Sequence, residues 1–157
     1  MDPRRARSAS PRPTEPGARR LSREAALQML YGLDSPTFSA DEGEAQIRAY
    51  WEHVDEVTRA EGRAYADELV RGVCEARGEL DDALRAAQTK WRVERMSRVD
   101  RSILRIATWE LRRGEVPAEV VINEAIELAK LFGSEDSSAF VNGLVERVAV
   151  RLGRLQR

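Results

Sequence analysis

The amino-acid sequence predicts an all-α fold of about seven helices. Strand patterns are nearly absent, apolar residues recur at helical spacing throughout, and helix-capping residues precede several of the periodic segments. A chain of 157 residues is long enough for one domain with a substantial apolar core. We expect helices over the ranges 20–34, 40–54, 59–77, 80–91, 98–113, 117–132 and 136–153.

Capping residues indicate where these helices begin and end. In a capping box, a Ser or Thr side chain and an acidic side chain three residues later satisfy the first N–H groups of a helix. Three such boxes occur: Ser39 to Glu42, Thr58 to Glu61 and Ser97 to Asp100. Helix ends are expected at Gly78, Gly114 and Gly133, since glycine readily adopts the terminating conformation. Proline is tolerated in a first helical turn, where Pro117 stands.

Apolar faces at a spacing of three and four residues predict the core. The clearest sets are Leu21, Ala25, Met29 and Leu33; Ile47, Tyr50, Trp51 and Val54; Leu80, Leu84, Ala87 and Trp91; and Val141, Leu144, Val145, Val148 and Leu152. Their aromatic members need no cofactor to explain them.

Charge divides the chain into an arm and a body. The net charge is −1, yet residues 1–20 hold six arginines against two acidic residues. We interpret residues 1–18, which contain four prolines, as a disordered basic arm, and residues 19–157 as a single helical domain. No apolar run approaches the ~20 residues of a membrane span, and the N-terminus lacks the apolar region of a secretion signal. A cytoplasmic protein without membrane contact is therefore expected.

The first helix begins with cations where anions are favoured. Arg19, Arg20 and Arg23 lie near its N-terminus, the positive end of the helix dipole, where each cation costs roughly 0.3–1 kcal/mol. On a helical wheel Tyr31 falls outside the apolar arc, on the same side as Arg20. Guanidinium groups beside an exposed aromatic ring suit single-stranded RNA. The alternative is that the ring packs against a neighbouring helix and the arginines only aid solubility.

The fifth helix carries a second basic stripe. Its members are Arg98, Arg101, Arg105 and Arg112, with Trp109 in line with them. This stripe is either a second nucleic-acid surface or a solvated face with the indole at the core margin. Asp100 and Glu110 point to the apolar side of the same helix, so each must be capped, paired or placed at an interface.

Catalytic and metal sites are not indicated. A single Cys74 and a single His53 provide no zinc-like cluster, and both are expected to be structural. No catalytic triad or glycine-rich phosphate loop is visible. Glu124 and Glu127 resemble half of a carboxylate site in a helical bundle but lack the histidine partner of such sites. We expect no enzyme activity, no metal and no cofactor.

Three blocks of the sequence carry a resemblance to a known family. "RRLSREAALQMLY", "VDRSILRIATWEL" and "PAEVVINEAIELAKLFGSEDSSAFVNG" are similar to the NusB family of transcription antitermination factors, in the same order and spacing. The resemblance covers about residues 19–150 and is most specific in the last block. It implies two small packed helical bundles without catalysis.

The resemblance also implies partners and binding residues. Members bind the boxA element of nascent ribosomal RNA transcripts together with NusE, a small-subunit ribosomal protein, and so support processive transcription by the elongation complex. By this carry-over the RNA-binding residues are Arg19, Arg20, Arg23, Tyr31, Arg105, Asp136 and Phe140. Asp100 would lie on the NusE surface. One departure is Ala139, which stands where a basic residue often precedes "FVNG".

Two other functions are compatible with the sequence. One is a helical interaction module or homodimer that binds no RNA. The other is the RNA-binding module of an RNA methyltransferase, with the catalytic domain on a second chain, because this chain has no strand, glycine loop and helix to hold a cofactor.

Overall fold

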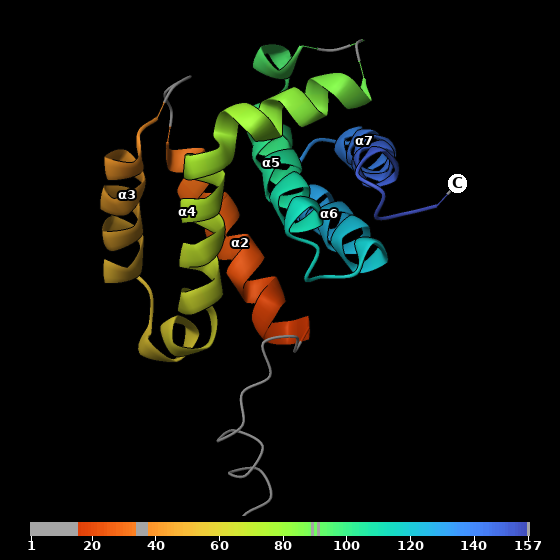
Figure 1. Cartoon of the computed structure of the whole chain (residues 1–157). Helices are drawn as coiled ribbons and strands as arrows, with labels where there is room; N and C mark the ends of the chain where they lie inside the picture. The colour runs from red at the N-terminus through yellow and green to blue at the C-terminus, as the bar shows by residue number, and fades with distance from the viewer. Residues whose placement is uncertain (1–15, 34–37, 89, 91, 157) are drawn as a thin grey trace, which may run out of the picture.

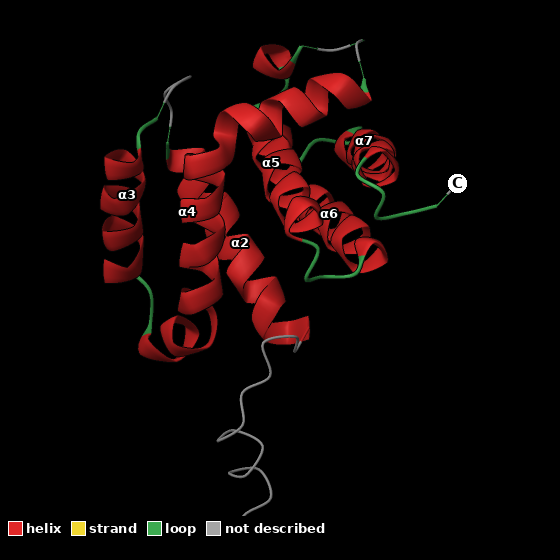
Figure 2. Cartoon of the chain, in the orientation of Figure 1, coloured by secondary structure: helices red, strands yellow, loops and turns green. Residues whose placement is uncertain are grey.

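A computed structural model describes residues 16–33, 38–88, 90 and 92–156. Within these residues there are six α-helices, one short 3₁₀ helix and no strand, joined by short loops (Figure 2). The elements are α2 (Pro16–Gly32), α3 (Ala40–Glu52), α4 (Glu56–Ala87), η1 (Val93–Arg95), α5 (Arg98–Arg113), α6 (Ala118–Phe132) and α7 (Ser137–Arg151). The all-α prediction is confirmed, and the helix count is close to the one expected. Residues 1–15 of the expected arm lie outside the described part, whereas residues 16–18, which were assigned to the arm, form the beginning of α2.

Helix α4 differs most from the sequence prediction. It is one continuous helix of 32 residues that joins the two segments expected over 59–77 and 80–91. The predicted end at Gly78 is wrong because the buried face continues past it, from Leu69 and Val73 to Leu80 and Leu84. A glycine inside a helix costs only about 1 kcal/mol, less than burying such a face contributes. Figure 1 shows α4 bending, without ending, as it passes from one group of helices to the other.

The helix starts follow the expected caps in two of three cases. Ser39 forms the complete capping box with Glu42, and the Ser97 hydroxyl accepts from the backbone N–H of Asp100. The box expected at Thr58 is wrong. Asp55 caps α4 instead, because its carboxylate accepts from both the backbone N–H of Thr58, at 2.9 Å, and the Thr58 hydroxyl, at 2.7 Å.

The helices pack as two small bundles around α5. Helices α2 and α3 pack with the first part of α4, and α6 and α7 pack beside α5, as Figure 1 shows. Helix α5 contacts α2, α4, α6 and α7, and every residue from 102 to 108 in it is buried. It ends at Gly114, whose φ of +74° is the left-handed conformation expected of a terminating glycine. Because α5 lies between the two bundles, its polar residues can bind side chains from several other helices.

One glycine permits the close approach of α4 and α5. A Cβ atom at Gly72 would lie 2.2 Å from Cε2 and Nε1 of Trp109, so the indole rests directly on the α4 backbone. At Gly78 an added Cβ would meet no atom within 4 Å. Gly72 is thus required by the contact with α5, whereas nothing in the described part of the chain packs against Gly78.

Among the described residues, no helix combines the length and apolarity that crossing a bilayer requires.

We predict opposite effects of alanine at these two glycines. Gly72→Ala should lower the free energy of unfolding by about 1–3 kcal/mol, because the new methyl group overpacks the contact with Trp109. Gly78→Ala should raise it by about 1 kcal/mol, because the site is open and alanine favours a helix interior. Urea unfolding followed by circular dichroism measures both. A stabilising Gly72→Ala would show that the α4–α5 contact is looser than described.

Candidate nucleic-acid interface

Arg19, Arg20 and Arg23 lie in the first half of α2, which begins at Pro16, and they point to different surroundings. Arg20 reaches α6, where its Nε and Nη2 donate to the two carboxylate oxygens of Glu124 at 3.0 and 2.9 Å. Its side chain is 50% exposed. This pair lies at the protein surface, so solvent or an anionic ligand can reach the guanidinium.

Arg23 is buried, in contrast to the expected exposure to phosphates. It is only 3% exposed, and its guanidinium donates to both carboxylate oxygens of Glu110 on α5, with Nε–Oε1 at 2.9 Å and Nη2–Oε2 at 2.8 Å. The hydroxyl of Tyr65 on α4 donates to the same carboxylate. Burial and the Glu110 charge raise the pKa of Tyr65 above its ordinary range, so the hydroxyl keeps its proton. Of the three alternatives for Glu110, capped, paired or placed at an interface, the structure shows pairing, with Arg23 as the partner.

Arg19 stacks on the ring of Tyr65. Its guanidinium carbon lies 3.8 Å from the ring centroid, well within the range of a cation–π contact. Arg19 and Arg23 are one helical turn apart, so both lie on the α4 side of α2. Arg19 is partly exposed and forms the outer end of this stack.

Tyr31 lies at the opposite end of α2. It is 46% exposed, and the guanidinium carbon of Arg98 stands 4.8 Å from its ring centroid. Arg98 also donates to the backbone carbonyl of Tyr31, at 3.4 Å. Tyr31 is exposed as expected, but the guanidinium beside it belongs to Arg98 of α5 and not to Arg20 or Arg23 of its own helix.

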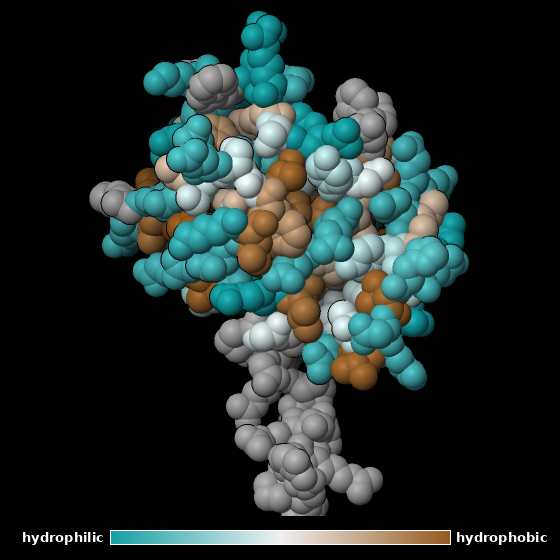
Figure 3. Space-filling view, turned by 180° about the vertical axis from the view of Figure 1, so that it is seen from behind, coloured by the Kyte–Doolittle hydropathy of each residue, from teal (hydrophilic) through white to brown (hydrophobic). Residues whose placement is uncertain are grey.

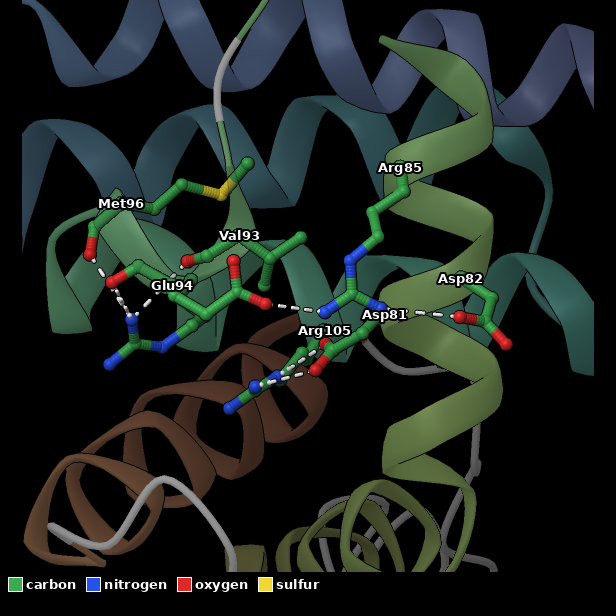
Figure 4. Close-up of polar contacts among 8 residues, drawn as sticks. Asp81, Asp82, Arg85, Val93, Glu94, Met96 and Arg105 are labelled. Carbon is green, nitrogen blue, oxygen red and sulfur yellow. Dashed lines mark hydrogen bonds and ion pairs between the residues drawn. The ribbon is translucent and has the colours of Figure 1, made fainter. Parts of the chain in front are cut away.

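The basic stripe expected on α5 is not a single solvated face. Arg105 is buried and donates to both oxygens of Asp81 on α4, with Nε–Oδ1 at 2.8 Å (Figure 4). Arg101 donates to backbone carbonyls at η1, including that of Val93. Arg112 pairs with Glu79 at the surface. These three arginines do not form one continuous charged face, because each side chain binds a different part of α4 or η1.

Figure 4 shows how the second buried pair is surrounded. Beside the Asp81–Arg105 pair, Arg85 of α4 bridges Asp82 on its own helix and Glu94 of η1. The Arg85–Glu94 contact has an Nη2–Oε1 distance of 2.6 Å. Helix α4, the η1 segment and α5 are thus joined by ion pairs at both buried and exposed positions.

Asp100 lies in the first turn of α5. Its backbone N–H is capped by Ser97, at 3.1 Å, whereas its carboxylate Oδ1 is buried and accepts no hydrogen bond within the described part of the chain. The sequence required this acid to be capped, paired or at an interface. Only its backbone is capped.

Asp136 and Phe140 lie at the start of α7. Asp136 is exposed, stands at the N-cap and makes no side-chain capping bond. Phe140 is partly buried against the core. Leu131 and Phe132, which end α6 a few residues earlier, are 61% and 37% exposed. Figure 3, seen from behind, shows apolar side chains gathered near the middle of that face within a mostly polar surface.

The residues considered for metal or redox chemistry have other surroundings. No group of three or more His, Cys, Asp or Glu within the described residues is arranged to hold a metal ion. Glu124 is bound by Arg20, and Glu127 lies 3.7 Å from the amine of Lys130. Burial raises the pKa of the Cys74 thiol to about 11, which leaves it a poor nucleophile.

Tyr65 is a residue of the site that the sequence did not indicate. It lies outside every motif and outside the resemblance blocks, and its importance comes from contacts with Arg19, Arg23 and Glu110 on two other helices. Periodicity within α4 marks it only as the neighbour of a buried stripe. A helix-by-helix reading of one sequence offers no signal for such a contact.

Known proteins are similar to this chain in both sequence and fold. Residues 20–150 match the model of the NusB family. The transcription antitermination protein NusB of Sorangium cellulosum (strain So ce56) is 50% identical over 142 residues, covering 90% of this chain and 98% of that protein. A solved structure of T. maritima NusB is similar at a TM-score of 0.71 and 35% identity, covering 84% of this chain and 90% of that one. A structure of antitermination factors NusB and NusE in complex with dsRNA shares the fold, at a TM-score of 0.68 and 22% identity over 86% and 98% of the chains.

We predict that the two carboxylates paired with α2 differ sharply in their effect on stability. Glu110→Gln should lower the free energy of unfolding by about 3 kcal/mol or more, because it leaves the Arg23 charge buried without a counter-ion. Glu124→Gln, a matched change, should cost about 1 kcal/mol or less, because water solvates the half-exposed Arg20. Urea midpoints compare them. Equal losses would contradict the burial described for Arg23.

Proposed function

The chain belongs to the NusB family, and we propose that it is an RNA-binding transcription antitermination factor. Together with NusE it binds the boxA element of nascent ribosomal RNA transcripts and supports processive transcription by the elongation complex. The proposal rests mainly on one observation: the chain is 50% identical in sequence to a transcription antitermination protein, over 90% of this chain and 98% of that protein. In this function the protein acts in the cytoplasm, without catalysis and without a cofactor.

The exposed members of the expected set are the proposed RNA ligands. Arg19 and Arg20 offer guanidinium groups at the start of α2, and Tyr31 offers an exposed ring at its end. A phosphate can approach the half-exposed guanidinium of Arg20 while Glu124, whose side chain is only 10% exposed, keeps its two bonds to Nε and Nη2. Asp136 and Phe140, at the start of α7, complete the proposed set of RNA ligands.

Arg23 and Arg105 support this surface from within. Both guanidinium groups are buried and bound at two points by carboxylates, so phosphate contact would require breaking a buried pair. Arg23 holds α2 against α5, and Arg105 holds α5 against α4. We assign both a structural role beside the RNA surface.

Asp100 is the proposed contact with NusE. Its Oδ1 atom lacks a hydrogen-bond donor among the described residues, although it is largely shielded from water. Asp100 as a whole is nevertheless partly exposed, so a basic group of a partner protein can approach its carboxylate. The position on the first turn of α5, next to η1, keeps this contact apart from the start of α2.

We predict that the two outer arginines set the salt dependence of RNA binding. For single strands, each phosphate contact contributes a slope of about −0.7 in log K against log salt, so Arg19→Ala/Arg20→Ala should make the slope shallower by about 1.4. Arg48→Ala/Arg71→Ala is the control, because these arginines lie beside Glu44 on the α3–α4 face. Fluorescence anisotropy with a boxA oligonucleotide measures both variants. The same slope change in both would remove Arg19 and Arg20 from the RNA surface.

We also predict that Asp100→Lys weakens NusE binding while the fold persists. The substitution removes a favourable charge from a helix start, at about 0.3–1 kcal/mol, but keeps the backbone capped by Ser97. Asp41→Lys makes the same kind of change in the first turn of α3 and should leave NusE binding intact. Calorimetric titration with NusE and a circular dichroism melt separate binding from folding. Unchanged affinity in folded Asp100→Lys would remove this residue from the interface.

A further inference from the structure

We propose that Tyr65 is a positioning residue of the RNA-binding surface. Its ring holds the guanidinium of Arg19 in a fixed plane at the start of α2, and Glu110 with Arg23 holds the ring from the buried side. The inference rests on the proposed function, because it presupposes that Arg19 binds RNA. Tyr65 itself is not expected to touch the RNA.

The stack connects an exposed group to a buried one through three helices. The Arg19 guanidinium carbon lies 3.8 Å from the ring centroid of Tyr65, and that of Arg23 lies 6.0 Å from it. The Tyr65 hydroxyl donates to Glu110, which Arg23 also binds at two points. A ring restrained at its hydroxyl and flanked by two guanidinium groups has little freedom to turn.

Restraint of this kind matters for an arginine that binds phosphate. An arginine side chain has many rotamers in water, and ordering them when RNA binds reduces affinity. Stacking on Tyr65 orders Arg19 before RNA arrives. A guanidinium that lies flat on a ring still presents its N–H groups at its edge, where a phosphate or a base edge can accept from them.

Glu110 holds the Tyr65 ring in place from the interior of the protein. Glu110 is 2% exposed and cannot itself meet RNA, yet it accepts hydrogen bonds from both Arg23 and Tyr65. Since the Tyr65 hydroxyl stays protonated, it remains a donor to Glu110 at neutral pH. The ring therefore stays in place under the conditions in which RNA is bound.

A double-mutant cycle tests the proposal with a boxA oligonucleotide and a scrambled one of equal length. Arg19→Ala and Tyr65→Leu should each weaken boxA binding by about 3- to 10-fold, the range of a partly exposed cation–π contact. The double variant should bind no more weakly than the weaker single variant, because Arg19 has lost its support in both. Equal effects of Arg19→Ala with and without Tyr65→Leu would overturn the proposal.

Conservative variants separate positioning from general stability. Tyr65→Phe keeps the ring and should bind RNA within about twofold of the parent, even though it melts lower after losing the bond to Glu110. Tyr50→Leu removes another partly buried tyrosine, one that contacts Trp51, and should not couple to Arg19. A loss of RNA binding in Tyr65→Phe as large as in Tyr65→Leu would contradict a role for the ring.

A change on the exposed side covers the case in which Tyr65→Leu fails to fold. Arg19→Lys keeps the charge but loses the flat contact with the ring, so binding should weaken while the salt slope is unchanged. Parental affinity in Arg19→Lys would overturn the proposal. If the parent does not distinguish boxA from the scrambled RNA, the proposed function itself fails. Parental discrimination without coupling to Tyr65 leaves that function standing and rejects only the positioning role.

Discussion

The buried pair of Arg23 and Glu110 is the interaction on which the arrangement of the two bundles depends. It joins α2 to the central helix α5, and the Tyr65 hydroxyl brings α4 to the same carboxylate. Burying two ions is costly unless their geometry and hydrogen bonding are nearly ideal. Here both carboxylate oxygens accept from Arg23, so the pair is satisfied in only one relative placement of these helices. We infer that it specifies how α2 crosses α5 more than it adds to net stability.

Helical geometry explains why three neighbouring arginines have three different environments. Residues four apart lie on one face of a helix, whereas adjacent residues are turned by about 100°. Arg19 and Arg23 therefore both face Tyr65, one outside and one inside, while Arg20 turns toward Glu124 on α6. Cations at the positive end of a helix are unfavourable in isolation, and in this fold each has an aromatic or anionic neighbour on another helix.

The sequence was sufficient for what depends on local periodicity and capping. It predicted the all-α class, the box at Ser39 and the termination of α5 at Gly114, because each is decided within a few residues. It failed at Gly78, where the burial of a face that continues through α4 outweighs a weak local preference for ending the helix. It left Glu110 to be capped, paired or placed at an interface and could not identify Arg23 as its partner, since the choice depends on how two distant helices cross. Tyr65 was missed for the same reason.

Two buried ion pairs bind α5 to different neighbouring helices. Glu110 fixes α5 to α2, and Arg105 fixes it to α4 through Asp81. One exposed residue depends on such a pair for its position: Arg19 stacks on Tyr65, whose hydroxyl donates to Glu110. An arginine on an isolated helix would sample many directions, whereas here its backbone and its supporting ring are both fixed by buried charges. The placement of this exposed guanidinium is therefore determined by charged groups that are themselves largely buried.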